Sequence, residues 1–130
     1  MAFKDSFTFG TIIFDDFSSL YDSDKIQFVF DPKRKDLTED DLLNLGVQGG
    51  MFYWKYSNYG LEIGFYGTDQ GILNILLIKC EDWKDQETEV KAWDNPVKSV
   101  TCKSKEDITK TVTEMLEYVK AQTGLEEKTM

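Results

Sequence analysis

Residues 51–80 read MFYWKYSNYGLEIGFYGTDQGILNILLIKC, and this stretch decides the fold of the chain. It contains three runs rich in aromatic and β-branched residues, 51–56, 61–66 and 72–80, which are separated by SNYG and TDQG. Each separator has four residues and ends in glycine, as in hairpin loops that close on a left-handed residue. The stretch therefore predicts a three-stranded antiparallel meander. The last run is apolar on both faces apart from Asn74, so we expect it to lie inside the sheet.

The residues before the meander predict two further strands and a short helix. Residues 6–14 alternate as a strand does, with a bend or bulge at Gly10, and residues 15–19 resemble a loop. Residues 25–30 alternate again and predict the second strand. A threonine cap and a closing glycine then predict a helix over 38–45.

The residues after the meander predict two more strands and the clearest helix of the chain. Residues 89–93 and 97–102 have strand character and are interrupted by Asp-Asn-Pro. Ser104 is a suitable N-cap for a helix over 105–122, and Gly124 ends it. The apolar residues of this helix form one stripe, which implies that the helix lies across a sheet face. They are Ile108, Val112, Met115, Leu116 and Val119.

Together these patterns predict a single α+β domain over residues 1–130, a length typical of one domain. We expect an antiparallel sheet of about six strands with the meander at its centre, the short helix near 38–45, and the C-terminal helix packed on the sheet. Residues 125–130 are expected to form a frayed tail.

The charge balance limits the classes of partner. Fifteen Lys and Arg stand against 24 Asp and Glu, which gives a net charge of −9. Such a chain repels nucleic acid and anionic membranes, so we expect neither as a partner. The first residues do not resemble an export signal, and the longest apolar run is too short to cross a membrane. We therefore expect a cytoplasmic protein in which Cys80 and Cys102 are free thiols.

The residue types that most catalytic sites need are missing. The chain has no histidine, which excludes Ser-His-Asp and Cys-His pairs and histidine metal sites. No phosphate-binding glycine motif is present. Solvated turns explain the neighbouring carboxylates better than an acid–base or calcium site does. We therefore expect no catalytic residue, no metal site, no cofactor and no enzymatic activity. The carboxylates in question are Asp15-Asp16, Asp22 with Asp24, Asp40-Asp41 and Glu81-Asp82.

One segment combines acidic residues with tryptophans. Residues 81–94 read EDWKDQETEVKAWD, in which six acids against two lysines give a net charge of −4. Either this is a polar loop whose tryptophans fold back onto the core, or it is a binding surface of aromatic anchors ringed by carboxylates. Both interpretations stay open at this point. On the second, the contact residues are Trp83, Trp93, Asp82, Asp85, Glu87 and Glu89, with Asp15 and Asp16 of the acidic N-terminal region as a second choice.

The small, acidic chain with its EDWKDQETEVKAWD segment resembles, in general character, the immunity proteins of bacterial polymorphic-toxin and contact-dependent inhibition systems. The resemblance implies a cytoplasmic protein that binds a cognate toxin domain and blocks its active site. The partner would be a basic protein such as a toxin nuclease domain. Charge steering would speed association, and a few desolvated anchors would supply affinity.

Three other functions compete with this interpretation. A phage-type inhibitor that mimics DNA would need carboxylates in a row, yet the C-terminal helix alternates Glu114 and Glu117 with Lys110 and Lys120. A small-molecule or lipid-binding domain would use the aromatic residues of 51–66 to line a pocket. An enzyme with carboxylate chemistry would leave no local motif, because its acids can come from different elements.

Overall fold

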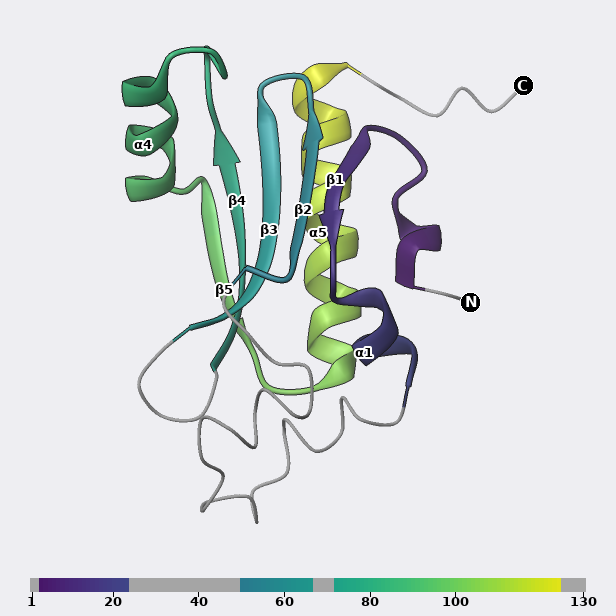
Figure 1. Cartoon of the computed structure of the whole chain (residues 1–130). Coiled ribbons are helices and arrows are strands. Elements are labelled where there is room, and N and C mark those ends of the chain that lie inside the picture. Colours follow the sequence, from purple (N-terminus) through teal and green to yellow (C-terminus); the bar gives the residue numbers. More distant parts are fainter. Residues whose placement is uncertain (1–2, 24–49, 67–71, 125–130) are drawn as a thin grey trace, which may run out of the picture.

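The chain folds as an antiparallel sheet with a long helix across one face (Figure 1). The computed structural model describes residues 3–23, 50–66 and 72–124. The predicted α+β class is confirmed, whereas the strand expected over 25–30, the helix expected over 38–45 and the frayed tail all lie outside the described residues. The described elements are η1 (Phe3–Ser6, a 3-10 turn), β1 (Thr11–Asp15), α1 (Ser18–Asp22), β2 (Phe52–Tyr56), β3 (Tyr59–Tyr66), β4 (Ile72–Lys79), α4 (Gln86–Asp94), β5 (Lys98–Cys102) and α5 (Lys105–Thr123).

The described strands form one five-stranded sheet in the order β1-β2-β3-β4-β5, where about six strands were predicted. Each strand pairs antiparallel with its neighbour in sequence, so the meander is confirmed. β4 lies between β3 and β5, as its apolar run predicted, and β5 confirms the strand expected over 97–102. In the register of β3 and β4, Leu61 faces Leu77 and Ile63 faces Ile75. These four buried side chains therefore form rows on one face of the sheet.

The hairpin between β2 and β3 is tighter than predicted. The two strands pair as far as Tyr56 and Tyr59, which leaves only Ser57 and Asn58 in the turn. Ser57 has a φ of 54°, so the left-handed residue that a short hairpin loop needs is Ser57 and not Gly60. The expectation of a four-residue loop was therefore wrong, and Gly60 lies within β3.

The first strand is also shorter than predicted. Strand pairing begins at Thr11 and not at residue 6, because Gly10, with a φ of 76°, bends the chain just before it. The preceding residues pack on β2 instead of extending the ladder, and the Phe9 carbonyl accepts the Trp54 indole N–H at 2.9 Å. The register with β2 then shifts between Ile12 and Phe14, which is a β-bulge. The bend predicted at Gly10 is thus confirmed, while the strand bounds were wrong.

Residues 89–93 belong to a helix, and the strand predicted there was wrong. They form part of α4. The buried or partly buried residues of this helix are Thr88, Glu89, Ala92 and Trp93, whose spacing of three and four residues places them on one helical face. A strand would have placed Val90 and Ala92 on the same face. In the helix the two side chains lie on different faces, since Val90 is 52% exposed while Ala92 is buried.

The C-terminal helix α5 forms as predicted. Ser104 is its N-cap, and the Ser104 hydroxyl accepts the Asp107 N–H at 3.1 Å. The Asp107 carboxylate in turn accepts the Lys103 N–H at 3.0 Å, a close variant of the capping box. Gly124, with a φ of 73°, closes the other end in the left-handed conformation.

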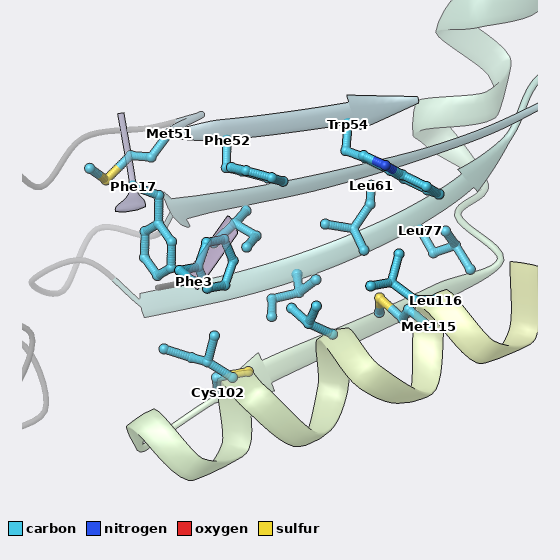
Figure 2. Packing of buried hydrophobic residues seen from close by; sticks show 14 of the residues in the cluster. Phe3, Phe17, Met51, Phe52, Trp54, Leu61, Leu77, Cys102, Met115 and Leu116 are labelled. Carbon is cyan, nitrogen blue, oxygen red and sulfur yellow. The ribbon is translucent and has the colours of Figure 1, made fainter. Parts of the chain in front are cut away.

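The main core fills the space between the sheet and α5 (Figure 2). Alternate side chains of β2, β3 and β4 point toward the apolar stripe of α5, with Trp54 and Phe52 wholly buried among them. Phe3 and Phe17 from the N-terminal segments complete the cluster through edge-on contacts between aromatic rings. The core therefore joins residues from both ends of the chain.

Two observations concern the environment of the protein. Cys80 and Cys102 are buried free thiols, as expected. Burial raises the pKa of the Cys102 thiol, which keeps it protonated and unreactive. Among the described residues, no helix combines the length and the apolar character that a membrane crossing requires.

Gly10→Ala is expected to cost more stability than Gly124→Ala, although both glycines are left-handed. The conformation alone costs an L-residue roughly 1 kcal/mol. At Gly10 the new Cβ would also lie 2.5 Å from the Trp54 indole nitrogen, whereas at Gly124 nothing lies within 4 Å. We therefore expect losses of about 3 and about 1 kcal/mol in the free energy of unfolding, measured with urea. Equal losses would contradict the tight contact between Gly10 and Trp54.

Candidate functional site

Trp83 packs residues 81–94, the candidate segment, against the hairpin between β2 and β3. Its indole N–H donates to the Ser57 carbonyl at 2.9 Å. Its ring lies so close to β3 that a Cβ on Gly60 would be 3.1 Å away. The Lys55 ammonium lies 4.1 Å from the centre of the ring, a cation–π interaction. Trp83 is therefore partly buried and directed at the sheet.

Trp93 packs α4 on the face of the sheet that α5 does not cover. The Trp93 ring lies 5.6 Å from the Tyr53 ring and contacts a small second cluster of Ile78, Cys80 and Ala92. Ile78 and Tyr53 alternate with the residues of the main core, so this cluster lies on the opposite face. The tryptophans thus fold back onto the protein, which is the first of the two interpretations of this segment.

Tyr53 lies under α4 with an unsatisfied hydroxyl. The hydroxyl oxygen is buried and has no hydrogen-bond partner among the described residues. Burial raises the pKa of Tyr53 well above its ordinary value of 10.0, and the negative charges of Glu89 and Glu62 raise it further. A buried hydroxyl without a partner is destabilising. The contact between α4 and the sheet is therefore mainly one of ring packing.

The candidate acids of this segment have different local roles. The Asp82 carboxylate accepts the Lys84 N–H at 3.0 Å and closes a turn. The Asp85 carboxylate accepts the Thr88 hydroxyl at 2.6 Å at the start of α4. The Glu89 carboxylate is partly buried and lies 3.5 Å from the Trp93 indole nitrogen. Glu87 is exposed, and within the described residues its side chain makes no hydrogen bond.

The side of α4 that faces away from the sheet carries Glu87, Val90, Lys91 and Asp94, which we call the outer face of α4. These residues are spaced as i, i+3, i+4 and i+7, so they form one stripe, and all four are exposed. Val90 is among the large apolar side chains with the highest exposure in the described chain, at 52%. The sequence interpretation missed Val90 and Asp94. Their helical spacing from Glu87 was the signal that could have identified them.

Few of these carboxylates are neutralised by neighbours. Among the described residues there is one ion pair, between Lys79 and Glu81 at 3.5 Å. Five lysines of the described residues lie over aromatic rings, and one of them, Lys79, also makes this ion pair. The acids of the outer face and Asp82 and Asp85 therefore have no ion-pair partner within the described ranges. The lysines over rings are Lys55, Lys79, Lys98, Lys105 and Lys120.

Asp15 and Asp16 lie far from this surface in the fold. Asp15 ends the edge strand β1 and Asp16 follows it, and α1 and α4 occupy opposite corners of the sheet (Figure 1). The Asp15 carboxylate accepts the N–H groups of Phe17 and Ser18 at 3.0 and 2.9 Å, so it caps α1. The loop predicted over 15–19 therefore leads into a helix at Ser18. The two acidic regions of the sequence do not converge into one site.

On the α5 side, the described aromatic side chains of β2 do not line an open pocket. Phe52 and Trp54 are wholly buried and pack in the main core. A groove of about 320 Å³ lies elsewhere, between β5 and α5, and includes Val100 and Met115. Among the described residues, no group of three or more acidic or cysteine side chains is placed to hold a metal ion.

Trp83→Ala is expected to destabilise the fold, because the side chain has a packing role. Loss of its ring contacts and its hydrogen bond to Ser57 should lower the free energy of unfolding by about 2 kcal/mol. Val90→Ala on the outer face removes an exposed side chain, so a change within about 0.5 kcal/mol is expected. Chemical denaturation of both variants tests this. A Trp83→Ala protein as stable as the parent would return Trp83 to the list of surface anchors.

Tyr53→Phe is expected to keep or raise stability at neutral pH, since it removes a buried hydroxyl without a partner. The pKa of Tyr53 is raised in the folded state, so ionisation of the unfolded chain above its ordinary value of 10.0 favours unfolding. The parent should therefore lose stability as the pH rises above about 10, and the variant should lose less of it. Thermal unfolding between pH 7 and pH 11 measures the difference, and parallel curves would contradict the burial of the phenol.

Comparison of the chain with models of protein families, with curated proteins and with solved structures found no match. An inference about its function therefore rests on the chemistry and geometry of its own residues.

Proposed function

We propose that the chain is a non-enzymatic inhibitor that binds a basic protein through the outer face of α4, and that it serves as an immunity protein against a bacterial toxin domain. The observation that carries the proposal is the exposed stripe of Glu87, Val90, Lys91 and Asp94. An exposed apolar side chain stands there between two carboxylates that have no ion-pair partner among the described residues. Protein interfaces usually have an apolar centre and a polar or charged rim.

The position of the tryptophans supports a revised role for them. Trp83 and Trp93 hold α4 against the sheet and do not offer their rings to a partner. A helix that is fixed before binding loses little conformational freedom when the partner arrives. In the proposal, Trp83 and Trp93 therefore position the surface, while Asp82, Asp85 and Glu87 supply its charge. Glu89 belongs to the support, because it lies beside Trp93.

Charge supports a basic partner. The chain carries a net charge of −9, and the carboxylates of the outer face of α4 have no ion-pair partner among the described residues, so they keep their field. A field of this kind attracts a basic surface before contact and can raise the association rate by an order of magnitude or more, on the order of 10 to 1,000-fold. A toxin nuclease carries such a surface, because it has to bind an anionic substrate. The buried free thiols suit action in the cytoplasm.

The test uses the double variant Glu87→Lys with Asp94→Lys. The two reversals should lower the association rate with the toxin domain about tenfold at low salt, because they change the rim charge of the interface. The partner used is the toxin domain encoded by the reading frame next to the gene for this chain. Association is measured by surface plasmon resonance at low and high salt. Protection is measured as growth of cells that produce the toxin domain together with the parent or the variant.

The matched control is Glu106→Lys with Glu117→Lys, which makes the same charge change on α5. Both control residues are exposed, and Glu106 lies in the first turn of its helix as Glu87 does. The control should keep protection and lose only the small part of the rate that net charge explains. Equal losses of association rate and protection in the two variants would contradict the assignment of the interface to α4. A parent protein that neither binds nor protects against the neighbouring domain would contradict the immunity function.

A further inference from the structure

β5 is an edge strand of the sheet that the described residues form. In the described part of the chain it pairs with β4 alone, through five consecutive pairs from Leu73 with Cys102 to Leu77 with Lys98. The other edge strand, β1, is interrupted by its bulge between Ile12 and Phe14, a feature that prevents regular pairing with a further strand. The outward N–H and carbonyl groups of β5 therefore form the more regular of the two edges of this sheet.

A groove runs beside this edge on the α5 side. It has a volume of about 320 Å³; the partly exposed Val100 contributes apolar surface to it, and Met115, which also lines it, is almost wholly buried. Asp107, Lys110 and Glu114 also line it, and their spacing of three and four residues places them along one ridge of α5. The volume lies within the range of roughly 300 to 1,000 Å³ that ligand sites have. An edge strand and a groove with apolar and charged walls thus lie side by side.

The charges of the groove indicate what it can hold. Lys98 lies over the Tyr118 ring at 4.9 Å, and Asp107 accepts the Lys103 N–H at 3.0 Å, so both have partners within the protein. Glu114 is exposed and has no ion-pair partner among the described residues. Lys110, four residues before Glu114, is exposed and also lines the groove. A basic side chain would lay its aliphatic stem over Val100 and bring its charged end to Glu114.

We propose that the β5 edge accepts an extended segment of a protein partner as an additional strand, with Lys or Arg at the alternate positions that enter the groove. Backbone hydrogen bonds to β5 would supply affinity, and the groove would select the side chains. A second copy of this chain fits less well, because each copy carries a net charge of −9 and would present the same carboxylates. This surface is distinct from the outer face of α4, so neither proposal depends on the other.

The experiment titrates the isotopically labelled protein with an eight-residue peptide that alternates valine and lysine and has blocked ends. Amide chemical shifts should change in β5 and along residues 107–115, and alternate amides of β5 should gain protection from hydrogen exchange. The same peptide with N-methyl groups on its alternate, β5-facing amides keeps its charge and loses the strand donors. It should bind about tenfold more weakly, since two or three hydrogen bonds are lost.

A matched pair of protein variants tests the groove. Glu114→Lys should weaken binding of the peptide about fivefold, whereas Glu117→Lys makes the same charge change outside the groove and should leave binding nearly unchanged. Equal binding of the methylated peptide would overturn strand addition. So would chemical-shift changes confined to α4 or β1, or a protein that sedimentation shows to pair through β5 with itself. Loss of binding in both variants alike would reduce the effect to net charge.

Discussion

The constraint on which the structure depends is the burial of one face of the meander under α5. Phe52 and Trp54 on β2, Leu61 and Ile63 on β3, and Leu73, Ile75 and Leu77 on β4 point to that face, and the stripe of α5 covers them. Fully burying a large apolar side chain contributes roughly 1.5 to 3 kcal/mol, so a row of such residues outweighs any single contact elsewhere. Once α5 occupies this face, every other segment has to use the opposite face or the edges of the sheet.

The position of α4 follows from this constraint. Tyr53 and Ile78 point to the face that α5 leaves open, and Trp83 and Trp93 cover them. Because the aromatic side of the segment is used for this packing, its remaining side chains face outward, and they are mainly charged. Lys55 lies over the Trp83 ring, and no ion pair among the described residues reaches the acids of the outer face. An acidic outer face is thus a consequence of how the aromatic residues are used.

The parts of the fold that could be predicted are those whose signal is local. The meander is visible in the alternation and length of its three runs, and α5 in its cap, its stripe and its closing glycine. The hairpin loop was assigned two residues too many, because Ser57 adopts a left-handed conformation that residue type alone does not indicate. The helix at 86–94 was taken for a strand over 89–93, because a five-residue window fits both periods. Its correct assignment depends on Trp93 reaching Tyr53, a residue forty positions earlier.

The candidate site shows the same division between local pattern and tertiary contact. The sequence by itself determined that residues 81–94 are acidic, bracketed by tryptophans and without the residues of common catalytic sites, since these are properties of composition and spacing. Only the tertiary structure decided that Trp83 and Trp93 face inward and that Asp15 and Asp16 lie at another corner of the sheet. It also decided that Glu87, Val90, Lys91 and Asp94 form the exposed stripe. The physical reason is that the side of a segment that becomes buried depends on which surface its neighbours leave uncovered, and that surface is set by contacts between residues distant in the chain.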